Sequence, residues 1–230
     1  LTSTTELDLL GGANLLAVEG PSGWELLQAR EATLIGPGQY RLRQLLRGQR
    51  GTEGAMGAAS GSRMVVIDAA CQRLPVPLAG LGQPRTFRAG PASRPLTDGS
   101  YTETQFTPHG IGLRPFAPAH LRARRNPDTG DIALTWTRRS RAPEADSWEG
   151  FEVPLAEEVE GYVVTIMAAP AGPVLRTLNA TSPQATYNVA QQVGDFGAAL
   201  GPGASLTFAV RQVSIAVGLG AEAKRTVGVG

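Results

Sequence analysis

Short apolar runs that alternate with polar residues recur along the whole chain, and turn residues such as Gly and Pro separate them. In the first half, residues 14–18, 24–35 and 40–47 have this pattern. Because alternate side chains of a strand lie on one face, the pattern predicts β-strands. Only residues 23–31 and 190–200 tolerate a helical interpretation, and glycines interrupt the second. The chain is therefore predicted to be all-β.

The first half is predicted to be a small β-sheet or barrel-like domain, residues 1–109. Apolar residues and arginines lie on opposite faces of residues 40–47, as in a half-buried strand. The continuously apolar residues 64–67 predict a central strand. Cys71 follows this run, and a buried small hydrophobic residue is the expectation there. Residues 74–118 are rich in Pro, Gly and Ser, which favours edge strands and extended connections.

The second half is predicted to be a β-sandwich of residues 119–230, which follows a Pro- and Gly-containing linker at 110–118. After a strong turn sequence, Ile132, Leu134 and Trp136 alternate with polar neighbours and are expected to face inward. Several short strands separated by turns over about 110 residues are typical of an immunoglobulin-like sandwich. Beyond residues 120–124 and 132–136, the further predicted strands are 162–167, 174–178, 185–189, 206–213 and 223–229.

Composition and charge exclude several classes of function. The 230 residues are 42% hydrophobic, and 21 basic residues balance 20 acidic ones for a net charge of +1. This balance gives no general attraction to nucleic acid, so direct nucleic-acid binding is not expected. A single cysteine excludes an intramolecular disulfide framework. The chain begins without Met, and we expect it to be a fragment of a longer protein.

The residues that carry chemistry do not form a recognisable catalytic or metal-binding pattern. The two histidines, His109 and His120, have no Cys, Asp or Glu at metal-ligand spacing around them. Glu157 and Glu158 are adjacent, and in a strand their carboxylates would point to opposite faces rather than across a sugar-binding cleft. We therefore predict that the chain is not an enzyme and has no catalytic residue, no metal site and no cofactor.

An acidic insertion and a run of arginines are the more informative charged features. Residues 142–160 hold seven acidic residues and no Lys or Arg, and they follow Arg138, Arg139 and Arg141. One interpretation is that the insertion folds back on its own arginines as surface ion pairs worth less than about 1 kcal/mol each. The alternative is that these charges dock a partner.

Two aromatic residues lie within the acidic insertion, and such anchors either hold a loop to its own domain or bury themselves in a neighbour. They complete the candidate interface, which consists of Trp148, Phe151, Arg138, Arg139 and Arg141.

The second half resembles a fibronectin type III module. Trp136 ends an alternating strand, residues 161–164 read Gly-Tyr-Val-Val, and residues 206–210 correspond to the penultimate strand of that family. The Gly-Leu-Gly-Ala-Glu turn at 218–222 also fits. The usual tyrosine of the penultimate strand is here Leu206, so the hydrogen bond of that tyrosine's hydroxyl group is expected to be missing.

The order of motifs along the chain resembles the C-terminal part of the host-specificity baseplate proteins of gene transfer agents and of related siphophage tail tips. These motifs are Trp-Glu-Leu-Leu-Gln at 24–28, the Arg- and Gly-rich segment 40–53, Gly-Leu-Arg-Pro at 112–115, and Pro118 before the sandwich. The resemblance implies a structural protein at the distal tip of a tail. Larger members carry an N-terminal region resembling a glycoside hydrolase, which is absent here.

The resemblance also implies partners and a location. We expect other baseplate and tail-tip proteins and further copies of the chain around the tail axis, in a virion-like particle whose parts are made in the bacterial cytoplasm. A receptor- or glycan-binding module of a tail adhesin is the alternative function, and a host-surface glycan or receptor would then be the partner.

Overall fold

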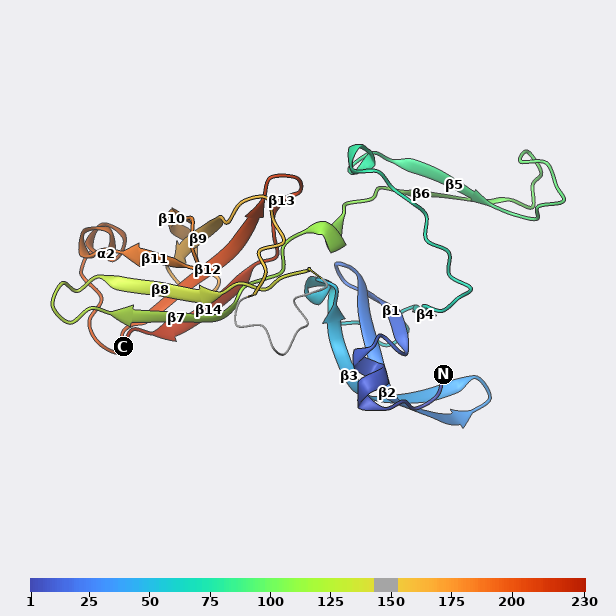
Figure 1. The fold of residues 1–230 in the computed structure, drawn as a ribbon, viewed down its shortest axis with the longest axis horizontal. Helices are drawn as coiled ribbons and strands as arrows, with labels where there is room; N and C mark the ends of the chain where they lie inside the picture. Colours follow the sequence, from blue (N-terminus) through green and yellow to red (C-terminus); the bar gives the residue numbers. More distant parts are fainter. Residues whose placement is uncertain (143–152) are drawn as a thin grey trace.

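The first half of the chain forms an open four-stranded antiparallel sheet (Figure 1). The computed structural model describes residues 1–142 and 153–230. The strand order is β3-β2-β1-β4, and within the described residues the two outer strands do not pair, so the sheet does not close into a barrel. The strands are β1 (Leu15–Gly20), β2 (Gly23–Gly36), β3 (Gln39–Gln49) and β4 (Met64–Val66).

The ends of β2 and β3 extend beyond the rest of this sheet. Strand β1 pairs with β2 only as far as Gln28, so residues 29–36 of β2 have β3 as their strand partner. A turn with Gly38 at φ +69° joins the two strands. Near this turn Leu34 is 59% exposed and Ile35 is 52% exposed. The result is an arm with an apolar tip, defined here as residues 29–46 and visible at the lower edge of Figure 1.

A short helix, α1 (Glu6–Leu10), lies against this sheet and was not expected from the sequence. Its N-cap is Thr5, whose side chain accepts a hydrogen bond from the Asp8 amide. The Gln28 side-chain amide donates to the Leu9 carbonyl at 2.6 Å and to the Ala13 carbonyl at 2.8 Å. The helix therefore depends on a contact from a distant strand rather than on its own five residues.

Strand β4 is not the central strand that its apolar sequence predicts. It is three residues long, pairs only with β1 and lies at the edge of the sheet. All three residues are exposed, by 48% at Met64 and 36% at Val66. The chain then turns away at Asp68, and Cys71 at the end of that turn is exposed rather than buried. The continuous apolar run of residues 64–66 therefore belongs to an exposed edge strand and not to a buried central one.

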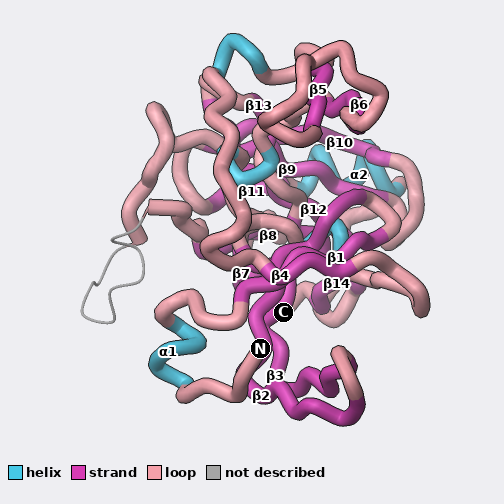
Figure 2. The backbone as a smooth tube through the Cα atoms, turned by 90° about the vertical axis from the view of Figure 1, so that its right-hand side faces the viewer, coloured by secondary structure: helices cyan, strands magenta, loops and turns pink. Residues whose placement is uncertain are grey.

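A two-stranded hairpin, β5 (Arg85–Ala89) and β6 (Thr102–Phe106), follows a long extended connection. No other strand of the described residues pairs with it. The hairpin and the arm project to opposite sides of the molecule, as both views show (Figures 1 and 2). Three single-turn 3-10 helices lie in the connections: η1 (Glu53–Ala55), η2 (Leu78–Gly80) and η3 (Ile111–Leu113).

The second half is the predicted fibronectin type III-like sandwich of two antiparallel sheets. One sheet has the order β11-β8-β7, and the other has β10-β9-β12 with β13 and β14 both pairing with β12. The strands are β7 (Ala119–Arg125), β8 (Ile132–Thr137), β9 (Tyr162–Met167), β10 (Val174–Ala180), β11 (Gln184–Tyr187), β12 (Ser205–Ser214), β13 (Gly218–Leu219) and β14 (Ala223–Gly228).

Alternate residues of facing strands fill the space between the two sheets. Ile132 and Leu134 are fully buried and Trp136 is 5% exposed, as their spacing predicts. The Trp136 and Tyr162 rings meet edge to face, with centroids 5.1 Å apart. Leu206 is fully buried at the position of the family's tyrosine. Among the described residues, twelve buried ones form this core cluster, whereas the cluster of the first half consists of Leu16, Leu27 and Ala29.

Near residue 190, where the sequence tolerates a helix interrupted by glycines, the structure has one helix, α2 (Val189–Phe196), which closes one end of the sandwich. Asn188 and Gln191 form a capping box at its start, and Gly197 ends it in a left-handed conformation. Asp195 accepts from Arg176 at 2.7 Å and from the Tyr187 hydroxyl at 2.8 Å, which ties the helix to both sheets.

The accessible surface of the chain is large for its mass. A compact monomer of 24.0 kDa exposes about 9,900 Å². This chain exposes 14417 Å², about 4,500 Å² more than that scaling gives. Exposed apolar residues of the arm, of β4 and of the hairpin, such as Leu34, Val66 and Phe106, contribute to this surface.

Removal of one side chain from the sandwich core should destabilise the fold strongly. Phe208 is fully buried, so Phe208→Ala is expected to lower the free energy of unfolding by about 3–5 kcal/mol in chemical denaturation. The control is Ile215→Ala, because Ile215 is 69% exposed and its truncation should change stability by no more than about 0.5 kcal/mol. Equal effects of the two substitutions would contradict the sandwich core.

Candidate functional site: the joint between the two halves

The surface that joins the two halves contains a groove of about 710 Å³, lined by residues from both. The first half contributes Arg47, Gly51 and Glu53, and the sandwich side contributes Arg138 and Arg139 among others. The groove therefore collects the three arginines that the sequence singled out, Arg138, Arg139 and Arg141. We call this region the joint.

The three arginines predicted as an interface follow β8, and two of them bind carboxylates of the acidic insertion. Arg138 donates to Glu160 at 2.9 Å and to the Val153 carbonyl at 2.7 Å. Arg141 holds Glu157 through two hydrogen bonds of 2.9 and 3.2 Å, and the Glu157 side chain is 2% exposed. For these two arginines the insertion does fold back on its own domain.

Arg139 differs from its neighbours because it reaches across to the first half. Its guanidinium donates to Glu53 at 3.0 Å and lies over the Phe116 ring, 5.2 Å from the centroid. A planar guanidinium can make both contacts at once, whereas a lysine ammonium lacks the flat face. Of the three predicted arginines, Arg139 is thus the one that connects the halves. The predicted anchors Trp148 and Phe151 lie in 143–152, outside the described residues.

Glu53 lies in residues 48–55, which include the last two residues of β3 and the turn after it. We call this segment the joint loop. Gly48 and Gly51 have φ of +59° and +81°, which favours glycine. A Cβ at Gly51 would also lie 3.1 Å from the Phe116 ring. The Thr52 hydroxyl accepts from the Leu26 amide at 2.9 Å and donates to the Gln49 carbonyl at 2.8 Å. Each of these residues fixes the position of Glu53.

The base of the joint loop is held by a buried carboxylate. Glu25 on β2 is fully buried and accepts from Arg47 at 2.6 Å and from the Gly48 amide at 3.0 Å. The hydrogen bond from Arg47 lowers the pKa of Glu25; burial opposes this shift, and the Gly48 amide adds to it. Glu25 is therefore ionised at neutral pH and locks β2, β3 and the joint loop together.

The linker is fixed on the sandwich side of the joint. The Pro115 carbonyl accepts from the Ala221 amide at 2.9 Å. A Cβ at Gly220 would lie 2.6 Å from that carbonyl oxygen, so the close approach requires glycine. The Gly-rich turn before the last strand therefore serves to hold the linker.

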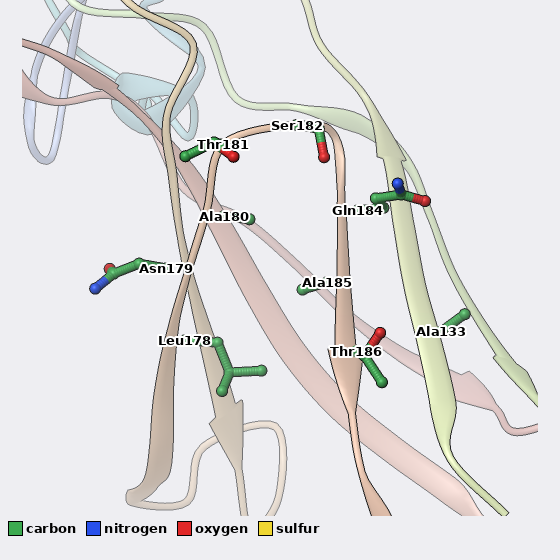
Figure 3. Close-up of a pocket in the computed structure, with 9 residues that line it drawn as sticks. All are labelled: Ala133, Leu178, Asn179, Ala180, Thr181, Ser182, Gln184, Ala185 and Thr186. Carbon is green, nitrogen blue, oxygen red and sulfur yellow. The ribbon is translucent and has the colours of Figure 1, made fainter. Parts of the chain in front are cut away.

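Figure 3 shows a second opening, of about 480 Å³, between the edge strands β10 and β11 of the sandwich. Leu178 points toward the strand that carries Thr186, while Asn179 points away from it. None of the nine lining residues is titratable or aromatic. This opening offers neither a catalytic group nor a ring on which a sugar could stack.

Candidate chemistry elsewhere is limited within the part of the chain that the structure describes. No group of three or more His, Cys, Asp or Glu residues is placed to hold a metal ion there. His109 and His120 are both exposed. In the same residues, no helix is long and apolar enough to cross a membrane.

A family model matches the first part of the chain. Residues 1–66 match the family described as Rcc01698-like, C-terminal. The match covers β1 to β4 and the joint loop, 66 of the 230 residues. No curated protein matches the chain.

Solved structures with some similarity are distant. The Clostridium perfringens spore cortex lytic enzyme SleM is 13% identical with a TM-score of 0.30, covering 57% of this chain and 35% of SleM. Domains d3–d4 of the rat CD45 extracellular region are 10% identical with a TM-score of 0.33, covering 93% and 94%. An Fn3-like protein from Clostridium thermocellum is 26% identical with a TM-score of 0.27, covering 48% and 91%. With TM-scores this low, these structures give no basis for assigning an activity to this chain.

Glu25, Glu53 and Phe116 belong to the joint, although their sequence pattern did not single them out as functional residues. The segment Arg47-Gly-Gln-Arg-Gly-Thr-Glu53 was a usable signal, because two glycines three residues apart next to charged residues indicate a shaped loop.

The pKa of Glu25 leads to a pH-dependent prediction. Because this pKa is lowered in the folded state, the stabilisation is present above the ordinary carboxyl pKa of about 4.3 and is lost as pH falls through the lowered value. Glu25→Gln should therefore lower stability by about 1–3 kcal/mol near pH 7, and the gap to wild type should close in acid. Denaturation across pH measures this gap. Glu6→Gln, in an exposed pair, is the control, and a gap unchanged at low pH would contradict the assignment.

Loss of the Arg139–Glu53 ion pair should change the relative orientation of the two halves more than it changes the free energy of unfolding. Arg139→Ala is expected to change the unfolding free energy by less than about 1 kcal/mol, because the Arg139 side chain is 45% exposed. NMR residual dipolar couplings should show the two halves sharing one alignment in wild type and in the Arg122→Ala control. In Arg139→Ala their alignments should differ, and Arg139→Lys should be intermediate. One shared alignment in Arg139→Ala would refute the bridge.

Proposed function

We propose that this chain is a non-enzymatic structural module of a phage-like tail tip, which assembles with other tail-tip proteins and with copies of itself. The observation that carries the proposal is the apolar surface that the first half leaves uncovered. The arm tip, β4 and Phe106 of the hairpin are all exposed, by between 36% and 59% at Leu34, Val66 and Phe106. Large uncovered apolar surfaces are typical of proteins that bury them in an assembly.

The resemblance of the motif order to tail-tip host-specificity proteins supports this role. Residues 1–66, which match the Rcc01698-like C-terminal family, include the arm, β4 and the joint loop. The Arg-Gly-Gln-Arg-Gly-Thr-Glu segment of the resemblance coincides with the loop that meets Arg139. A protein that holds two β-modules at a fixed angle is suited to a ring or tip in which each module contacts a different neighbour.

The absence of hydrolytic activity is part of the proposal. Catalysis by acid and base groups requires titratable side chains that converge on a concave site. The Arg138, Arg139 and Arg141 partners Glu160, Glu53 and Glu157 are each engaged in ion pairs that organise the joint. The chain would act through its surfaces, in particles assembled from parts made in the bacterial cytoplasm.

A receptor- or glycan-binding role is the second candidate, and Trp24 favours it. This ring is 39% exposed and lines an opening of about 390 Å³ beside the joint, together with Thr52, Arg114 and Glu222. An aromatic face with nearby polar groups can bind a sugar ring. Arg63 lies over the same ring, 5.4 Å from its centroid, and would compete for that face.

The tail-tip role is tested by incorporation into particles. In the host that encodes this chain, Leu34→Asp in the arm should abolish co-sedimentation of the protein with purified tails, because a charge would enter a buried contact. The matched control is Ile215→Asp, a charge at an exposed apolar residue of the sandwich, which should still co-sediment. Wild-type protein absent from the tails would refute the role.

The two candidate functions differ in the effect of Trp24. If the structural role alone holds, Trp24→Ala particles should contain the protein and bind host cells as wild type does. Loss of cell binding with normal incorporation would establish the receptor- or glycan-binding function instead.

A further inference from the structure

Two elements of the first half have strand edges without a partner among the described residues. One is β4, the edge of the four-stranded sheet, and the other is the β5–β6 hairpin, a sheet of two strands. Unpaired edges expose a row of backbone N–H and C=O groups that can pair with another strand. Both β4 and the hairpin can therefore gain backbone hydrogen bonds by pairing with a further strand.

The outward-facing groups of β4 follow from its register with β1. Ile67 donates to the Leu15 carbonyl and Glu19 donates to the Arg63 carbonyl, both at 2.9 Å. In an antiparallel pair such hydrogen-bonded positions alternate with non-bonded ones. Met64 and Val66 are therefore non-bonded positions toward β1, and their backbone N–H groups point away from β1. On that side the Val66 carbonyl accepts a hydrogen bond from the Cys71 thiol at 3.4 Å.

The opposite edge of the same sheet, β3, is protected against strand addition, whereas β4 is not. Arg41 and Arg43 place charges along β3, and Gln44 has φ +52°, which kinks the strand. Residues 64–66 carry no charge, no proline and no left-handed residue. This contrast indicates that β4 is the edge used for docking.

The face of the hairpin that carries both of its phenylalanines, called its apolar face here, is partly exposed. Phe87, Ala89 and Phe106 share this face with Arg85, Thr102 and Thr104 by their register, and Arg88 and Glu103 lie on the other face as an ion pair. Phe106 is 58% exposed. A lone two-stranded ribbon is marginally stable in water and gains stability from a third strand or a covering surface.

We infer that the β5–β6 hairpin of one copy adds to the β4 edge of a second copy and extends the β3-β2-β1-β4 sheet across the two chains. The apolar face of the hairpin would continue the exposed row of Met64 and Val66. The inference deepens the proposed function, on which it rests, by naming the surface through which copies associate.

A second copy is the occupant that the structure favours. A different protein could supply a strand for the β4 edge or a sheet for the hairpin. A second copy of this chain supplies both, because it has a hairpin for the edge and an edge for the hairpin. Within one chain the two elements lie apart (Figure 1), and the hydrogen bond from Gly82 to the Pro108 carbonyl holds the base of the hairpin. The surface excess of about 4,500 Å² is in the range that obligate interfaces bury.

The contact is head to tail, because an edge in one copy meets a hairpin in the other. Head-to-tail contacts form closed rings when the rotation between copies allows closure. Each copy then uses both elements, and the extended sheet ends at the protected β3 on one side and at the outer strand of the added hairpin on the other.

The test uses one variant for each side of the contact. Val66→Pro removes an outward N–H without removing a hydrogen bond to β1, and Phe106→Asp puts a charge on the apolar face of the hairpin. Sedimentation velocity at about 100 µM should show self-association of wild type and monomers for each variant alone. An equimolar mixture of the two variants should restore dimers and nothing larger, because one intact edge meets one intact hairpin.

Controls separate this result from misfolding and from other contacts. Ile215→Asp should associate as wild type does, and Met64→Pro, whose N–H also points outward, replaces Val66→Pro if that variant does not fold. A monomeric wild type, a self-associating Phe106→Asp variant or a mixture without dimers would each overturn the inference. Self-association without incorporation into tails would instead contradict the tail-tip role and leave this contact standing.

Discussion

The structure depends on an imbalance in burial between its two halves. The sandwich has two sheets that cover one another, and its core residues, such as Ile132 and Phe208, are fully buried. Among the described residues, the first half has a four-stranded sheet with a core cluster of three buried residues and a separate hairpin, and no second sheet covers the arm, β4 or the hairpin. A single sheet face cannot be shielded from water without another layer. The remaining apolar surface is therefore the feature on which the proposed assembly role rests.

The joint turns these two unequal halves into one oriented unit. Glu25 fixes the joint loop, the loop presents Glu53, and Arg139 binds Glu53 while it stacks on Phe116. Arg138 and Arg141, by contrast, bind carboxylates of their own domain. Neighbouring arginines in one segment thus bind carboxylates in different halves of the chain, and the charge pattern of the sequence does not show which arginine binds which half.

Local patterns predicted the fold class and most strands, because strand alternation and turn chemistry are properties of neighbouring residues. Ile132, Leu134 and Trp136 are buried for that reason. Long-range contacts could not be predicted in this way, and the Arg139–Glu53 pair joins residues 86 positions apart. The prediction that residues 64–67 form a central strand was wrong because an exposed edge strand can have the same composition as a buried one.

Hydrogen exchange of the isolated chain at high dilution measures the imbalance directly. The account predicts slow exchange for the amides of β8, β9 and β12 in the sandwich, and fast exchange for β4 and the β5–β6 hairpin, which have few buried contacts. On assembly the second group should become protected. If β4 and the hairpin in the dilute chain were as protected as β12, the first half would be complete on its own and the account would be wrong.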